Sequence, residues 1–173
     1  MYQIQGLPLH PLTVHAAVVL VPLAALLALL FVVPRMRGWA GLPMAAVSVA
    51  AVLSLIVAKA SGGSLKNTLE RLGGGRQWEI SPIGKLVLEH QRRANVLLVL
   101  MIAFAAVAVV AYVLSRRPDR FRGATQLVVC ALLVVGAVAV GAQVYRVGDA
   151  GSRAVWNPGG TVDYGSSGPS SIR

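Results

Sequence analysis

Three histidines, at positions 10, 15 and 90, are the side chains of this chain that are best suited to bind a ligand. A neutral imidazole is the commonest metal ligand in proteins, and two imidazoles from facing helices can hold a haem iron. Imidazole, carboxylate and phenol groups can also hydrogen-bond the ring oxygens of a quinone and move its protons. A histidine at a helix end can, however, serve only to hydrogen-bond a neighbouring carbonyl or carboxylate. The sequence leaves these three interpretations open.

Other kinds of site are disfavoured by what the sequence lacks. Cys130 is the only cysteine and lies within an apolar run, so it can form neither an intramolecular disulfide nor a cysteine-based metal cluster. No pair of histidines has the close spacing of a zinc motif such as H-E-x-x-H. No nucleophile, base and acid stand together on a loop. We therefore do not expect the chain to be an enzyme on its own.

The elements that must position the histidines are membrane-spanning helices. Of the 173 residues, 56% are apolar and 13% are charged, against about 25% charged in soluble domains. A helix needs about 20 apolar residues to cross a bilayer core of about 30 Å. Four runs meet this requirement, at residues 11–33, 42–58, 94–114 and 124–145. We expect an all-α integral membrane protein, a four-helix bundle threaded up-down-up-down.

The net charge of +10 fits the same interpretation. The basic residues concentrate at the ends of the apolar runs and in the loops between them, where anionic lipid headgroups attract them. No motif for binding RNA or DNA is present. The expected partner is therefore the lipid bilayer and not a nucleic acid.

The connections between the spans give the domain boundaries. Ser81 and Pro82 are typical of a helix N-cap followed by proline at the first helical position, so the third helix is expected to start near residue 82. The loop before it, residues 59–81, contains two glycine clusters and is expected to be mobile. The polar tail, residues 157–173, is expected to be disordered. This gives a membrane domain at residues 1–156 and a flexible tail.

Antiparallel threading brings all three histidines to one end of the bundle. Both chain termini and the loop at residues 59–81 belong to the same end. Asn95 enters the third span there, and Tyr145 and Arg146 leave the fourth span there. We therefore take these three residues as further candidates for ligand binding, although interfacial anchoring also explains the tyrosine and the arginine.

Helical phase selects among the histidines. His90 belongs to a stripe with alternating spacings of four and three, which is typical of an inward-facing surface. The stripe consists of Ile83, Val87, His90, Ala94, Leu97, Met101 and Phe104. His10 and His15 are about 140° apart around a helix, so they do not face one metal unless His10 precedes the helix. His15 and His90 are therefore the expected pair of haem ligands, and His10 is a further candidate.

The distribution of positive charge predicts an orientation in the plasma membrane. The short loops at residues 34–40 and 115–123 carry six arginines, and no basic residue precedes the first span. Short loops rich in arginine stay in the cytoplasm, so both termini are expected outside it. Seven basic residues within positions 59–93 argue for the opposite orientation.

Three segments resemble one family of bacterial membrane proteins, called domain of unknown function 2231 (DUF2231). GLPLHPLTVH at residues 6–15 is similar to the family's opening motif, and VYRVGDAGSRAVW at residues 144–156 is similar to its closing segment. His90 with Asn95 resembles its entry into the third helix. The resemblance covers most of the chain and implies a membrane fold with the motif residues His10, Pro11, His15, His90, Tyr145, Arg146 and Gly148.

The chain departs from the family pattern in two places. Gly141-Ala142 stands where a glycine pair is common, and the middle loop is longer and more basic than expected. The family has no established activity. Some of its members are joined to Rieske-type iron–sulfur domains, which implies a redox setting, but this chain lacks the cysteines of such a domain.

Two functions follow as hypotheses. The chain is a small redox subunit that binds haem b or quinone at the histidine-lined end, or it is a non-catalytic anchor or assembly subunit of a larger complex. Both hypotheses allow other membrane or redox subunits as partners. Transport is disfavoured because only Pro22, Ser48 and Ser54 interrupt the apolar spans.

Overall fold

Four long helices make up most of the molecule. The computed structural model describes residues 3–4, 7–117 and 119–162. The long helices are α1 (Leu9–Val32), α2 (Arg37–Leu72), α4 (Pro82–Ser115) and α5 (Gly123–Trp156). A short helix, α3 (Arg76–Ile80), lies between α2 and α4, and a minimal hairpin of β1 (Gln3–Ile4) and β2 (Leu7–Pro8) precedes α1. The predicted all-α fold with four long helices is confirmed.

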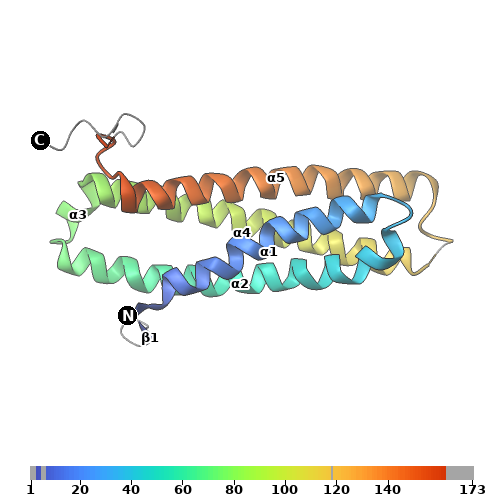
Figure 1. Cartoon of the computed structure of the whole chain (residues 1–173), viewed down its shortest axis with the longest axis horizontal. Helices are drawn as coiled ribbons and strands as arrows, with labels where there is room; N and C mark the ends of the chain where they lie inside the picture. Colours follow the sequence, from blue (N-terminus) through green and yellow to red (C-terminus); the bar gives the residue numbers. More distant parts are fainter. Residues whose placement is uncertain (1–2, 5–6, 118, 163–173) are drawn as a thin grey trace, which may run out of the picture.

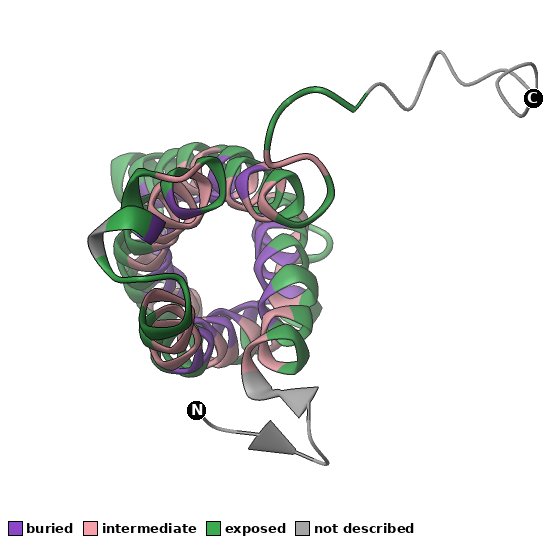
Figure 2. Ribbon diagram, turned by 90° about the vertical axis from the view of Figure 1, so that its left-hand side faces the viewer, coloured by how far each residue is buried: buried purple, intermediate pink, exposed green. Residues whose placement is uncertain are grey.

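The four long helices form a closed ring. Helix α1 packs against α2 and α5, and α4 packs against the same two helices. Figure 2 looks along the bundle and shows the buried positions on the inner side of this ring. Consecutive long helices run in opposite directions, so both described chain ends and α3 lie at one end of the bundle (Figure 1). The up-down-up-down threading is therefore as expected.

The outer surface of the ring is apolar. Large aliphatic side chains are exposed along every long helix, for example Val19 at 62%, Val99 at 67% and Val135 at 68%. All four long helices are long and apolar enough to cross a membrane. Lipid tails solvate such a surface, whereas water does not. The protein therefore spans the membrane and is in contact with the lipid bilayer.

The interior combines many alanines with a few large side chains. The large side chains that are fully buried include Phe31, Met44, Leu97, Met101 and Leu133. Small residues between them let the helix backbones approach closely, which is how helices associate in lipid. On α4 the predicted inward stripe is buried from Leu97 to Phe104, but its first member, Ile83, is 44% exposed. The predicted inward face is therefore confirmed over the membrane-embedded part of α4.

Helix α1 is shorter than its three long neighbours. It has 24 residues, or about 36 Å at 1.5 Å per residue, while the others have 34 to 36 residues, or more than about 50 Å. Figure 1 shows that the excess lies beyond the start of α1. Because α1 alone is long enough for a bilayer core of about 30 Å, the excess stands in the headgroups or in water. We call it the water-side extension, residues 62–89 and 148–156.

The expected mobile loop at residues 59–81 is wrong over most of its length. Helix α2 continues through Leu72, and α3 follows after a turn in which Gly74 and Gly75 have φ values of +82° and +65°. Glycine costs up to about 1 kcal/mol per residue within a helix. The packing of α2 against α1 outweighs this cost, because Ser61 is buried and Gly62 lies against the His10 ring.

The start of the third long helix is as predicted. Pro82 is the first residue of α4, and the Ser81 hydroxyl accepts a hydrogen bond of 3.1 Å from the Gly84 amide. Residues 157–162 form a turn and irregular backbone after α5. The rest of the tail that was expected to be disordered lies outside the described residues.

A pair of glycines on α5 tests the packing of α4 against α5. A Cβ at Gly136 would lie 2.7 Å from Cδ2 of Phe104, which is 3% exposed, whereas a Cβ at Gly141 would meet nothing within 4 Å. We expect Gly136→Ala to lower the free energy of unfolding by about 1–3 kcal/mol through overpacking. Gly141→Ala is the control and should leave stability unchanged or raise it by about 0.5–1 kcal/mol. Unfolding in mixed detergent micelles measures both, and equal effects would contradict this packing.

Candidate functional site

Two of the histidines face each other across the bundle axis. The rings of His10 on α1 and His90 on α4 have centroids 6.3 Å apart and are inclined at 80° to each other. Both residues are partly buried. Helix α1 begins at Leu9, so His10 already belongs to its first turn, where Pro11 needs no hydrogen-bond donor. The pair lies at the base of the water-side extension, where α1 starts.

The His10 ring is held by α2. Its Nδ1 lies 3.0 Å from the carbonyl oxygen of Ala58 and 3.3 Å from the hydroxyl of Ser61. Thr13 adds to this contact, because its hydroxyl donates to the carbonyl of His10 at 3.0 Å and lies 3.0 Å from the Ser61 hydroxyl. The first turn of α1 is thus joined to α2 by a small polar cluster.

The His90 ring is held in the same way by α5. Its Nδ1 lies 3.0 Å from the carbonyl oxygen of Val147. Each ring also rests against a glycine of the helix that holds it. A Cβ at Gly62 would lie 2.9 Å from Cε1 of His10, and a Cβ at Gly151 would lie 3.1 Å from Cε1 of His90. Any larger residue at either position would displace an imidazole.

These contacts define the tautomer of both rings. A carbonyl oxygen can only accept, so each Nδ1 must carry a hydrogen and donate it. In the neutral imidazole the other nitrogen, Nε2, then bears a lone pair. Within the described part of the chain, no protein group hydrogen-bonds either Nε2. A histidine that binds a metal through one ring nitrogen usually donates a hydrogen bond from the other, often to a backbone carbonyl.

The structure pairs His90 with His10 and not with His15, the expected partner. His15 is exposed, and its Nδ1 hydrogen-bonds the carbonyl of Pro11 within its own helix. The reason is the phase of α1. His10 is part of the helix and points to the axis, so His15, about 140° away, points outward.

The other predicted site residues lie away from the histidine pair. Asn95 is exposed on α4, and Tyr145 is 75% exposed on α5. The side chain of Arg146 is exposed too, but its backbone carbonyl accepts a hydrogen bond of 3.1 Å from Arg93. These three residues share the end of the bundle with the histidines, and in the described part of the chain none of them hydrogen-bonds either ring.

An ion-pair network beside His90 joins α4 to α5. Arg93 donates to Glu89 at 2.7 Å and lies 4.0 Å from Asp149, which also accepts a bond of 2.9 Å from Arg153. The buried Gln143 donates to the carbonyl of Arg93 at 2.9 Å. From the sequence alone, an arginine at this position is expected to face headgroups or water. One available signal was Gln143, because an amide in an apolar span needs a partner.

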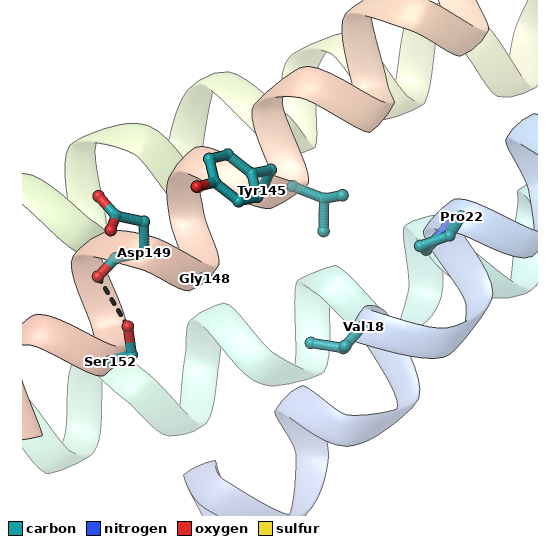
Figure 3. A pocket seen from close by; sticks show the side chains of 7 residues that line it. Val18, Pro22, Tyr145, Gly148, Asp149 and Ser152 are labelled. Atoms are coloured by element: carbon teal, nitrogen blue, oxygen red, sulfur yellow. Dashed lines mark hydrogen bonds between the residues drawn. The ribbon is translucent and has the colours of Figure 1, made fainter. Parts of the chain in front are cut away.

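A groove at the edge of the membrane lies between α1 and α5 (Figure 3). Its volume is about 540 Å³, and Val18 and Pro22 line it on α1. On α5 it is lined by Val144, Tyr145, Gly148, Asp149 and Ser152. The Ser152 hydroxyl is engaged, because it donates to the carbonyl of Asp149 at 3.0 Å. The histidine pair does not line this groove.

Among the described residues, no three histidine, cysteine, aspartate or glutamate side chains gather around one point that could hold a metal ion. A metal bound by the two imidazoles would therefore need its remaining ligands from groups of another kind. Haem meets that condition, because the porphyrin provides four of the six iron ligands.

Comparison with known proteins agrees with the membrane fold. No curated protein and no solved structure matches this chain. The family model described as "Predicted membrane protein (DUF2231)" matches residues 6–164, which include all three histidines. The match covers most of the chain and confirms the resemblance seen in its terminal motifs. This protein belongs to the DUF2231 family of predicted membrane proteins.

Proposed function

We propose that this protein is a small redox subunit of the membrane that holds haem b iron between His10 and His90. The anchored pair of imidazoles, each with an unengaged Nε2, is the observation that supports the proposal. Two imidazoles that face each other across a metal, with metal–nitrogen bonds of about 2.0 Å, have ring centres about 6 Å apart. The observed separation is 6.3 Å. Iron with six ligands exchanges one electron without binding substrate, which suits an electron carrier.

The surroundings of the pair suit a flat ligand. At the level of the imidazoles, α2 presents Ala58, Ser61 and Gly62, and α5 presents Ala150 and Gly151. Because these side chains are small, they occupy little of the space that a porphyrin would need between α2 and α5. Helix α1 starts at this level, while its neighbours continue into the water-side extension. The other ionisable groups nearby, on α4 and α5, are already paired with one another.

A quinone site is an alternative redox function that has less structural support than the haem site. The membrane side of the α1–α5 groove, at Val18, Pro22 and Val144, would admit a quinone from the lipid phase. Tyr145 lines it, and spacings of three and four place His15 on the same face of α1 as Val18 and Pro22. The groove is otherwise lined mainly by apolar side chains and backbone, so few groups are available to bind two ring oxygens.

The proposed location is the plasma membrane, with both termini outside the cytoplasm. The support is the bias of the two short loops, which carry six arginines at the end of the bundle opposite to the histidines. In this orientation the histidine pair lies at the extracytoplasmic surface. An electron carrier at that surface would serve partners outside the cytoplasm.

A second candidate function is assembly of a larger complex without a cofactor. The water-side extension exposes apolar side chains beyond the membrane, among them Leu72 at 81%, Ile80 at 64% and Trp156 at 69%. Exposed apolar side chains in water mark surfaces that bind other proteins when they are contiguous. If this is the function, His10 and His90 serve only to join α1 to α2 and α4 to α5 through their hydrogen bonds.

The haem proposal predicts different spectra for the three histidine variants. Protein purified in mild detergent and titrated with haemin should show the sharp reduced-minus-oxidised bands of a bis-imidazole haem b. We expect His10→Ala and His90→Ala to lose these bands, whereas His15→Ala should keep them because His15 is exposed and apart from the pair. A wild-type chain that stays colourless, or loss of the bands in His15→Ala alone, would rule out the proposed site.

Two neighbouring glycines of α2 provide a test that keeps both histidines. Gly62→Ala should displace the His10 ring and weaken haem binding about 10-fold, since disturbing the group that orients a ligand costs this much or more. Gly63→Ala is the matched control, because a Cβ there meets nothing within 4 Å. Both affinities are measured by haemin titration. Equal affinity in the two variants would mean that His10 does not ligate the iron.

The assembly function predicts a different outcome. If the water-side extension binds a protein, Leu72→Asn with Ile80→Asn should abolish a crosslinked complex in native membranes, while His10→Ala should leave it intact. Both apolar side chains are exposed, so their loss should not unfold the bundle. Crosslinks that survive the double substitution would exclude this surface, and an absent complex in the wild-type protein would exclude the assembly function.

A further inference from the structure

At the end of the bundle opposite to the histidines, a second pocket lies between the start of α2 and the end of α4. Its volume is about 280 Å³, and its lining includes Arg37 and Gly38 of α2 and Tyr112, Ser115 and Arg116 of α4. In contrast to the groove between α1 and α5, it is lined by two cationic side chains. The pocket therefore offers positive charge in a concave site at the edge of the membrane.

Arg37 is fixed in place without a carboxylate. Its guanidinium donates to the carbonyls of Phe31 and Val32 at 3.4 and 3.3 Å, and it lies over the rings of Phe31 and Phe121. Arg116 is exposed. In the described part of the chain, neither arginine has a carboxylate within ion-pair distance. The charge of a partly buried arginine is stabilised when an anion approaches it.

The position of the pocket indicates which anion it meets. Trp39 is 64% exposed on the first turn of α2, and Tyr112 lines the pocket, as is usual for aromatic residues at headgroup depth. Towards the membrane centre the two helices expose aliphatic side chains, such as Leu42 at 58% and Val109 at 37%. A molecule with a phosphate in the pocket and acyl chains along these surfaces is a phospholipid.

We infer that this pocket binds the phosphate of an anionic glycerophospholipid through Arg37 and Arg116. Basic pockets between transmembrane helices are a known means of binding such headgroups. Arg37 presents its remaining N–H groups from a fixed position, while Arg116 closes on the phosphate from the end of α4. The Tyr112 hydroxyl has no hydrogen-bond partner among the described residues and is available to the headgroup. This inference is independent of the haem proposal.

The test compares two arginines at the same end of the bundle. Delipidated protein is titrated with phosphatidylglycerol or phosphatidylcholine, and bound lipid is counted by native mass spectrometry. We expect phosphatidylglycerol to be retained preferentially and Arg116→Gln to weaken its binding about fivefold. Arg120→Gln is the control, because it removes the same charge from an exposed residue that does not line the pocket. Its affinity should match the wild-type value.

Two further measurements distinguish binding in the pocket from general charge attraction, and a lipid from free phosphate. Gly38→Leu should block the pocket without changing the charge, since a Cβ at Gly38 meets open space and the residue lines the pocket. Inorganic phosphate should not displace the lipid. Equal losses in Arg116→Gln and Arg120→Gln would show general charge attraction and overturn the inference. Displacement by phosphate alone would overturn the assignment to a lipid.

Discussion

The attachment of the first turn of α1 to α2 is the constraint on which the histidine site depends. His10 Nδ1 is bound to the Ala58 carbonyl, and Thr13 meets the buried Ser61 in the same cluster. This attachment sets the level at which α1 starts and turns His10 to the bundle axis. It also leaves His15 on the outer surface. If α1 were rotated by a single residue, about 100°, His10 would leave the axis and His90 would have no partner.

The sequence predicted the parts of the fold that depend on composition and local signals. The four apolar runs identified the spans, antiparallel threading placed the histidines at one end, and Ser81-Pro82 marked the start of α4. The inward face of α4 was readable because charged residues, Arg92 and Arg93, flank the apolar stripe. Helix α1 has no such contrast, since it is apolar around most of its circumference. Nothing in its pattern indicated whether His10 or His15 turns inward.

The remaining differences arise where tertiary packing outweighs local preference. Glycines at residues 62 and 63 predict a break, but close contact of α2 with the His10 ring favours a continuous helix. Arg93 is expected at the surface because arginine is costly to bury. It is instead held by Glu89, by Asp149 and by the carbonyl of Arg146. The contacts of Arg93 with Asp149 and Arg146, and of the His10 ring with α2, join residues that are distant in the sequence, and single-sequence patterns do not report such contacts. Only the Glu89–Arg93 pair, four residues apart on one helix, was readable from the sequence.

The two ends of the bundle neutralise their charges in different ways. At the histidine end, some of the basic residues pair with carboxylates on the same helix, as Lys66 does with Glu70 and Arg153 with Asp149. At the other end, the two short loops contain six arginines and a single acidic residue, Asp119, which is paired with Arg122. The second end needs anions from its surroundings, and a membrane surface supplies them. The helix lengths show which end stands in water, because α2, α4 and α5 extend beyond the start of α1 at the histidine end.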